Sequence, residues 1–150
     1  MINESGLWDK LRPWLSNYGV PTRIESAVTS GLPDIIYSSG GTLILLELKI
    51  ERSGTIKMPI FQYSWARKNS HQLAPHYHWV AVLPETSSEV KFYKFETLLP
   101  HIVSNENQRT MYAYTDSVGC DYLVNKMADV SDWLSYIEEA EFNFNYSYED

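Results

Sequence analysis

The chain is 150 residues long, and 44% of them are hydrophobic and 21% charged, a composition that excludes a disordered or fibrous protein. Its single cysteine, Cys120, excludes an intramolecular disulfide and a multi-cysteine zinc module, and favours a reducing, cytoplasmic setting. The longest apolar run, residues 43–50, contains two charges and is too short to span a membrane. The net charge is −7, but residues 1–97 carry +1 and residues 98–150 carry −8, so a polyanion is expected to approach the first of these segments.

The first predicted element is an amphipathic helix over residues 7–18, because its apolar side chains recur every three to four positions. These side chains are Leu7, Trp8, Leu11, Trp14, Leu15 and Tyr18. Gly19 and Pro21 are expected to end the helix, and Pro13 to kink it or shorten its first half. A weak strand pattern follows over residues 23–28.

The next elements are two strands joined by a turn that is typical of a hairpin. Residues 34–37 form a short strand, residues 38–41 read Ser-Ser-Gly-Gly, and residues 42–50 form the longest predicted strand. The later elements are a helix over residues 59–70, strands over 78–83 and 90–95, a short helix over 97–103, and a helix over 131–141 capped by Ser131. Residues 142–150 fit either a strand or an irregular tail.

This order of elements predicts a single α/β domain over residues 1–150, with a mixed central sheet flanked by helices. No internal repeat or interdomain linker is visible in the sequence. The core is expected to span about residues 3–97, and residues 98–150 are expected to form an acidic C-terminal addition.

Charged residues in and beside the strongest strand carry the predicted chemistry. Alternate side chains of a strand share a face, so Glu47 and Lys49 are expected on one face and Leu48 on the other. Charges in so apolar a strand are costly unless they are paired or bind an ion. Asp34 and Glu47, with the backbone carbonyl of Leu48, offer oxygen ligands suited to a hard divalent cation. Lys49 is then placed to orient or deprotonate an attacking water.

Pro33-Asp34 followed by Glu47-Leu48-Lys49 resembles the signature of the PD-(D/E)XK nuclease superfamily, and the surrounding frame is similar over residues 3–83. Within that superfamily the chain looks most like small phage and archaeal enzymes of the Holliday-junction-resolvase and VRR-NUC type. The resemblance implies a restriction-endonuclease-like core, with Asp34 and Glu47 as ligands of Mg²⁺ or Mn²⁺ and Lys49 as the catalytic lysine. It also implies branched, flapped or junction DNA as the substrate, and a homodimer.

Two further residues are carried over from the resemblance. The family's helix glutamate, a third metal-binding acid, corresponds to Glu4, which lies 30 positions before Asp34. At about 100° per residue Glu4 falls on the apolar side of its helix, whereas Asp9 falls on the far side. Glu25 is the rival for the third acid. Gln62 matches the glutamine that often follows the catalytic lysine in this superfamily, and we expect it near the attacking water or the DNA backbone.

The basic residues that follow the motif are expected to contact DNA phosphates. They are Arg52, Lys57, Arg67 and Lys68. The histidines at positions 71, 76 and 78 suggest a zinc site, but only Cys120 could complete it, so this interpretation is not favoured.

Each candidate also has an ordinary structural interpretation. Asp34 fits a turn residue, Glu47 and Lys49 a weak surface ion pair, Glu4 a helix-terminal acid, and Gln62 an exposed helix residue. For any one residue, the structural interpretation competes with the functional one. Taken together, the structural interpretations do not explain why two acids and a lysine occur in this pattern.

The sequence therefore predicts a divalent-metal-dependent DNA endonuclease that hydrolyses phosphodiester bonds. The alternative is a catalytically retired nuclease fold that acts as a DNA-binding or protein-interaction module. The charge of −8 over residues 98–150 favours this alternative, and the intact Asp34, Glu47 and Lys49 oppose it. A restriction-like enzyme with sequence specificity is a third interpretation, for which the chain is short.

Overall fold

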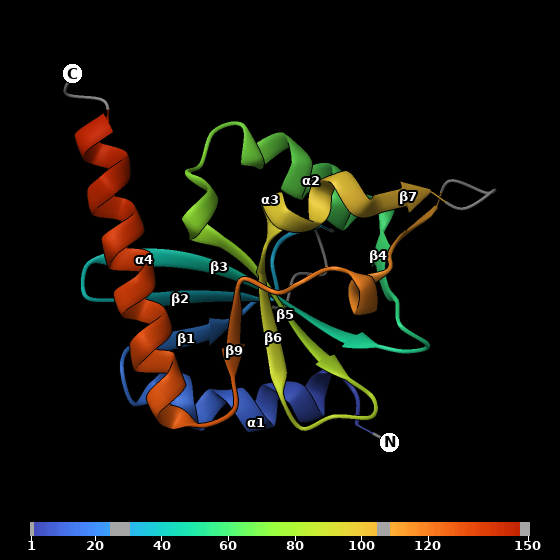
Figure 1. The fold of residues 1–150 in the computed structure, drawn as a ribbon, viewed down its shortest axis with the longest axis horizontal. Coiled ribbons are helices and arrows are strands. Elements are labelled where there is room, and N and C mark those ends of the chain that lie inside the picture. The colour runs from blue at the N-terminus through green and yellow to red at the C-terminus, as the bar shows by residue number, and fades with distance from the viewer. Residues whose placement is uncertain (1, 25–30, 105–108, 148–150) are drawn as a thin grey trace.

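The computed structural model describes residues 2–24, 31–104 and 109–147. In chain order the elements are α1 (Glu4–Ser16), β1 (Val20–Arg23), β2 (Ile35–Ser39), β3 (Thr42–Glu51), β4 (Ile56–Pro59), α2 (Ile60–Ser70), η1 (Pro75–Tyr77), β5 (His78–Pro84), β6 (Val90–Lys94), α3 (Phe95–Leu98), η2 (Leu99–His101), β7 (Ile102–Ser104), β8 (Thr110–Ala113), η3 (Thr115–Ser117), β9 (Tyr122–Val124) and α4 (Met127–Ser147). Within these residues the strands form a six-stranded mixed sheet and a three-stranded sheet, with helices on both faces of the larger one (Figure 1). The predicted α/β class, with a mixed central sheet flanked by helices, is confirmed.

The longest strand, β3, organises the larger sheet, whose order is β1-β2-β3-β5-β6-β9. β2 and β3 form the predicted hairpin, and its turn places Gly40 and Gly41 at φ 57° and 83°, which favours glycine. β2 pairs with residues 42–46 of β3, whereas β5 runs parallel to residues 45–51. Among the described strands, the end of β3 therefore has a neighbour on one side only.

The two faces of the larger sheet carry separate hydrophobic cores. α1 and α4 cover one face, and α2 and α3 cover the other; Figure 1 shows α1 below the sheet and α2 and α3 above it. Because side chains alternate along β3, Leu46 and Leu48 enter the first core. Glu47 and Lys49 lie on the opposite face, in register with Val80 and Val82 of the second core.

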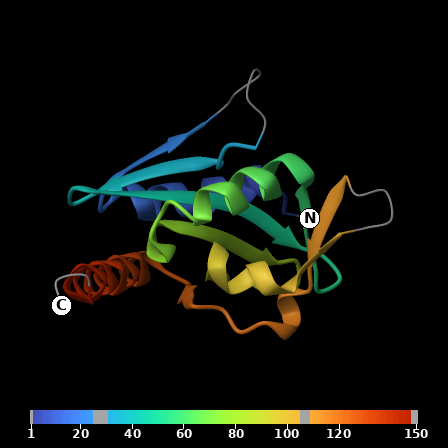
Figure 2. The same ribbon diagram turned by 90° about the horizontal axis from the view of Figure 1, so that it is seen from above.

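The C-terminal segment, predicted as an addition to the core, supplies parts of both sheets and of the first core. β8 pairs with β4 and β7, and β9 pairs with β6 at the edge of the larger sheet. Trp133 of α4 is fully buried, stacks on Tyr37 at a centroid distance of 6.3 Å, and meets Trp79 and Phe92 edge-on. Figure 2 shows α4 and the β7–β8 pair at opposite ends of the molecule.

Two boundaries in the N-terminal part differ from the prediction. Pro13 does not shorten α1, which continues through it to Ser16; Pro13 is exposed, so the carbonyl that the proline leaves without an intrahelical partner can reach water. The first strand begins at Val20, three residues before the predicted start, because residues 20–23 pair antiparallel with β2, where Val20 faces Ser38. Residues 25–28 of the predicted strand lie outside the described residues.

The C-terminal boundaries also differ from the prediction. Residues 97–103 contain the end of α3, η2 and the start of β7 instead of one short helix. α4 begins at Met127, four residues before the predicted start, because the Asp129 carboxylate accepts hydrogen bonds from the backbone N–H groups of Asn125 and Lys126. It continues to Ser147, so the described part of the predicted strand or tail is helical. None of the described helices has the length and apolar composition needed to cross a bilayer.

Candidate active site

Asp34 and the end of β3 are brought together by the β2–β3 hairpin. Ile35 faces Leu46, and one further residue along this register places Asp34 opposite Glu47. The backbone N–H of Leu48 donates a hydrogen bond to Asp34 Oδ2 at 2.7 Å. Because the N–H and C=O of one strand residue point to the same side, the Leu48 carbonyl also points to the open side of β3, toward Asp34.

Glu47 is the most unusual group of the site. Its side chain is fully buried, and neither carboxylate oxygen has a hydrogen-bond partner among the described residues. Burial, and after it the charge of Asp34, raises the pKa of Glu47 to about 8, although the charge of Lys49 acts in the opposite direction. An orphaned carboxylate beside a second one is destabilising unless a proton or a cation joins it.

Lys49 connects the strand to two helices. It is only 5% exposed, and its Nζ donates a hydrogen bond to Gln62 Oε1 at 2.6 Å. The same Nζ lies 4.0 Å from Glu4 Oε1. The structure therefore brings the predicted lysine together with the predicted glutamine in the first turn of α2 and with the predicted glutamate in the first turn of α1.

Glu4 stands at the edge of this group, with its side chain half exposed. Asn3 caps α1 by accepting a hydrogen bond from the backbone N–H of Gly6 at 2.9 Å, so the position of Glu4 is fixed from the first turn. Burial raises the pKa of Glu4, Lys49 lowers it, and Asp34 raises it again. Asp9 is exposed, as the helix geometry predicts, and the rival acid Glu25 lies outside the described residues.

The donor set fits a hard divalent cation. Among the described residues no three His, Cys, Asp or Glu side chains group closely enough to hold a metal ion by themselves. Asp34 and Glu47 supply two carboxylates, and the Leu48 carbonyl supplies a backbone oxygen directed to the same side. Oxygen donors of this kind, with the Glu47 carboxylate buried and unpartnered within residues 2–24, 31–104 and 109–147, suit Mg²⁺ or Mn²⁺, which keep several water ligands.

Gly31 holds the Gly-Leu-Pro-Asp turn against α2. Its φ is +98°, and a Cβ at this position would overlap the carbonyl of Phe61, the residue before Gln62. The turn that delivers Asp34 therefore packs on the helical turn that delivers Gln62.

Gly31→Ala is expected to lower the free energy of unfolding by about 1–3 kcal/mol, from the positive φ together with the overlap. Gly119→Ala is the matched control, because a Cβ there would meet no atom within 4 Å. Urea unfolding of both variants measures the difference, and equal stability of the two would contradict this account of the turn.

A cleft of about 650 Å³ opens beside Glu4 and Lys49. Its walls come from the start of α1, the ends of β1 and β3, and the turn that follows β3. The basic residues in its lining are Arg23, Lys49, Arg52 and Lys57. This surplus of cations next to the carboxylates suits a phosphate backbone.

Of the four basic residues predicted to contact DNA, two line the cleft and two do not. Arg52 and Lys57 line it, whereas Arg67 and Lys68 do not. Arg67 instead lies over the ring of Tyr63, at 6.0 Å from its centroid. Arg23 lines the cleft and was missed, because its position follows from the pairing of β1 with β2 and has no local sequence signal.

The histidines do not form a metal centre in the described part of the chain. His78 is buried against Phe95, with ring centroids 5.2 Å apart, and burial lowers its pKa to about 4. His76 packs against Tyr77 and Phe144. Both rings therefore act as core aromatics at neutral pH.

No protein-family model matches the sequence, and a comparison with curated proteins finds no match. Among solved structures, the chain is similar to Hjc, a Holliday junction resolvase from the archaeal hyperthermophile Archaeoglobus fulgidus, with a TM-score of 0.48 and 14% sequence identity. The similarity covers 71% of this chain and 85% of that chain. It concerns the course of the backbone, so the functions of individual side chains rest on their own geometry.

Proposed function

We propose that the chain is a divalent-metal-dependent endonuclease that hydrolyses phosphodiester bonds in DNA. The observation that carries the proposal is the buried Glu47 carboxylate, which has no partner among the described residues and lies across the hairpin from Asp34. Lys49, held by Gln62, stands beside them at the edge of a cleft lined by cations. A structural role alone would not require that a buried acid with no partner among the described residues and a lysine lie at one end of β3, with the lysine held by a glutamine of α2.

The residues divide the work of hydrolysis among them. Asp34, Glu47 and the Leu48 carbonyl would hold Mg²⁺ or Mn²⁺, which when bound supplies charge for the phosphate and acidifies a coordinated water. Gln62 fixes the direction of the Lys49 ammonium through the bond at 2.6 Å. Lys49 orients the attacking water and stabilises the charge that develops on the phosphate. Glu4 is a further acid within reach of Lys49, suited to a water-mediated contact with the metal.

Branched, flapped or junction DNA is the substrate we propose, and a homodimer is the matching assembly. Both follow from the sequence resemblance to small resolvases, because a dimer with two-fold symmetry can cut paired strands of a junction together. The cleft supports a phosphate backbone as ligand and does not discriminate among DNA shapes.

A cleavage panel tests the proposal. Labelled single strand, duplex, flap and four-way junction are incubated with wild type and with Asp34→Asn, each in EDTA, Mg²⁺ or Mn²⁺. Cutting that needs metal and is lost in the variant supports the proposal, and the preferred substrate defines its class. Folded wild type that binds DNA but cuts none of these substrates would instead identify a retired nuclease fold. Cleavage at one defined duplex sequence would identify a restriction-like enzyme.

Arg23→Gln is expected to weaken DNA binding and to reduce the slope of log Kd against log salt by about 1, because one phosphate contact is lost. Arg12→Gln is the control, since Arg12 is exposed on α1 and does not line the cleft. Fluorescence anisotropy in EDTA at several salt concentrations gives the slopes. An unchanged slope for Arg23→Gln would remove β1 from the DNA-binding surface.

A further inference from the structure

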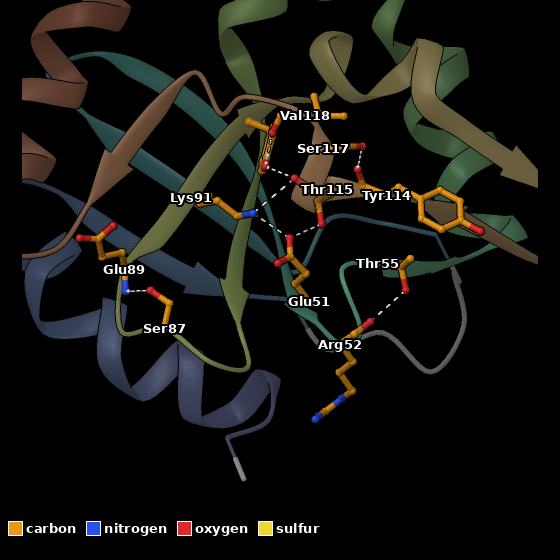
Figure 3. Close-up of polar contacts among 11 residues, drawn as sticks. Glu51, Arg52, Thr55, Ser87, Glu89, Lys91, Tyr114, Thr115, Ser117 and Val118 are labelled. Atoms are coloured by element: carbon orange, nitrogen blue, oxygen red, sulfur yellow. Dashed lines mark hydrogen bonds and ion pairs between the residues drawn. The ribbon is translucent and has the colours of Figure 1, made fainter.

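A buried polar cluster lies directly beyond the candidate site, where β3 ends (Figure 3). Lys91 Nζ of β6 is 2.7 Å from Glu51 Oε2, and the same oxygen accepts a hydrogen bond from Thr115 Oγ1 of η3. Lys91 Nζ also donates to the backbone oxygen of Thr115 at 3.3 Å, and Tyr93 Oη donates to that oxygen at 2.9 Å. The cluster thus joins three segments that are far apart in the sequence.

The cluster is more suited to fixing geometry than to adding stability. Thr115 is fully buried and Glu51 is 8% exposed. Burial is the largest single effect on Lys91 and by itself would lower its pKa. The hydrogen bond to Glu51, together with the contributions of Tyr93 and of the Glu51 charge, raises the pKa overall, so Lys91 stays charged at neutral pH. Buried ion pairs contribute little net stability compared with well-packed apolar residues of the same size. They do specify which groups must meet, because each unpaired partner would be costly to bury.

The chain that leaves Glu51 forms the basic wall of the cleft. Arg52 and Thr55 exchange backbone hydrogen bonds of 2.9 and 3.1 Å, which closes a tight turn. Ser53 and Gly54, within the turn, have φ values of 52° and 77°. The cleft residues contributed by this stretch are Arg52, Ser53, Thr55 and Lys57.

The C-terminal segment supports this wall from behind. The backbone N–H of Asp116 donates to the Gly54 carbonyl at 3.2 Å, and a Cβ at Gly54 would overlap the Asp116 carboxylate. Further along, Lys57 of β4 pairs with Tyr112 of β8. The turn after β3 is therefore held by residues 110–117 on its outer side and by Glu51 at its base.

We propose that Lys91 and Thr115 are positioning residues of the candidate active site, which act through Glu51 and the turn after β3 to present Arg52 and Lys57 to DNA. The inference rests on the proposed function for its DNA readout. It assigns residues 110–117, in the acidic part of the chain, to building the cleft. The acidic part of the chain repels DNA, but it also supports the turn that carries Arg52 and Lys57, and these cations offset the repulsion.

Thr115→Val tests this inference, because valine keeps the shape of threonine and removes only the hydroxyl group. Amide hydrogen exchange at residues 52–57 is expected to accelerate about tenfold, the change that follows from losing one hydrogen bond to a charged group. The Kd for duplex DNA in EDTA is expected to rise several-fold, while the cleavage rate at saturating DNA stays within about twofold of wild type. Thr115→Ser, which restores the hydroxyl, is expected to recover both values.

Ser117→Ala is the matched control, since the Ser117 hydroxyl lies in the same η3 helix and donates to the Tyr114 carbonyl instead of Glu51. Wild-type exchange at residues 52–57 in Thr115→Val would overturn the inference. So would exchange that accelerates equally throughout the core, which is the mark of a purely structural residue. Lys91→Met provides the same readouts if Thr115→Val does not fold. If wild type binds no DNA, the proposed function fails, whereas local exchange still decides whether the cluster positions the turn.

Discussion

Lys49→Met is expected to reduce the rate of DNA cleavage by a factor of about 10²–10⁴, the usual contribution of one group that orients or protonates reactants. Lys49 is only 5% exposed, and methionine retains an apolar stem that can pack in the same space. The substitution therefore removes the charged ammonium group. Gln62 Oε1 then loses the partner it has at 2.6 Å. The loss should appear in single-turnover rates at saturating DNA, because the variant keeps Asp34, Glu47 and the cleft cations other than Lys49.

Lys126→Met is the control for a lost lysine, since Lys126 is exposed and does not line the cleft. Its cleavage rate should match that of wild type. Lys49→Met should still bind metal, and the rise in its melting temperature on addition of Mn²⁺ measures this binding. Cleavage by Lys49→Met within about threefold of wild type would place Lys49 outside the reaction, below the contribution expected of a general acid or base.

Glu47→Gln is expected to stabilise the metal-free protein, and the gain should grow as the pH rises. Burial, reinforced by Asp34, raises the pKa of Glu47 from 4.5 to about 8. Between these values the folded protein keeps a proton that the unfolded chain has lost, so the free energy of unfolding falls with rising pH. This contribution is fully present below the unfolded pKa and is lost as the pH rises through the folded pKa. Glutamine does not ionise, so the variant escapes the loss, with a gain on the order of a few kcal/mol at pH 9.

Thermal unfolding in EDTA from pH 5 to pH 9 measures this difference. Glu139→Gln is the control, because Glu139 is exposed on α4. With Mn²⁺ added, wild type should be stabilised more at pH 8 than at pH 6, since the metal must displace the proton on Glu47. The variant should lose most of that response. Parallel stability curves for wild type and Glu47→Gln would show that the carboxyl group is ionised or solvated in the folded protein.

The elements that the sequence identified correctly are those whose signal is local. The helical repeat of Leu7, Leu11 and Leu15, the Gly40-Gly41 turn and the apolar run of β3 each determine their own conformation. Such patterns miss elements that form only by pairing with another strand: β1 depends on β2, and β4 and β8 depend on each other. Short strands of three or four residues carry too little periodicity to be recognised alone.

The candidate site also contains features that follow from local sequence patterns and features that depend on the tertiary structure. Spacing and alternation placed Asp34, Glu47 and Lys49 together, because a hairpin fixes register and a strand fixes which side chains share a face. The sequence did not indicate which basic residues line the cleft, because this depends on the tertiary structure. Arg23 lines it together with Arg52 and Lys57, whereas Arg67 lies over the ring of Tyr63.

The sequence by itself determined the α/β class, the hairpin and the meeting of Asp34 with the end of β3, because these depend on neighbours within one or two elements. Only the tertiary structure decided that Glu47 is buried with no hydrogen-bond partner in the described part of the chain, that Gln62 holds Lys49, and that Glu51, Lys91 and Thr115 meet. These features depend on pairs of groups separated by 13 to 64 positions. Their distances are set by the packing of whole helices and strands, which no local pattern of residues encodes.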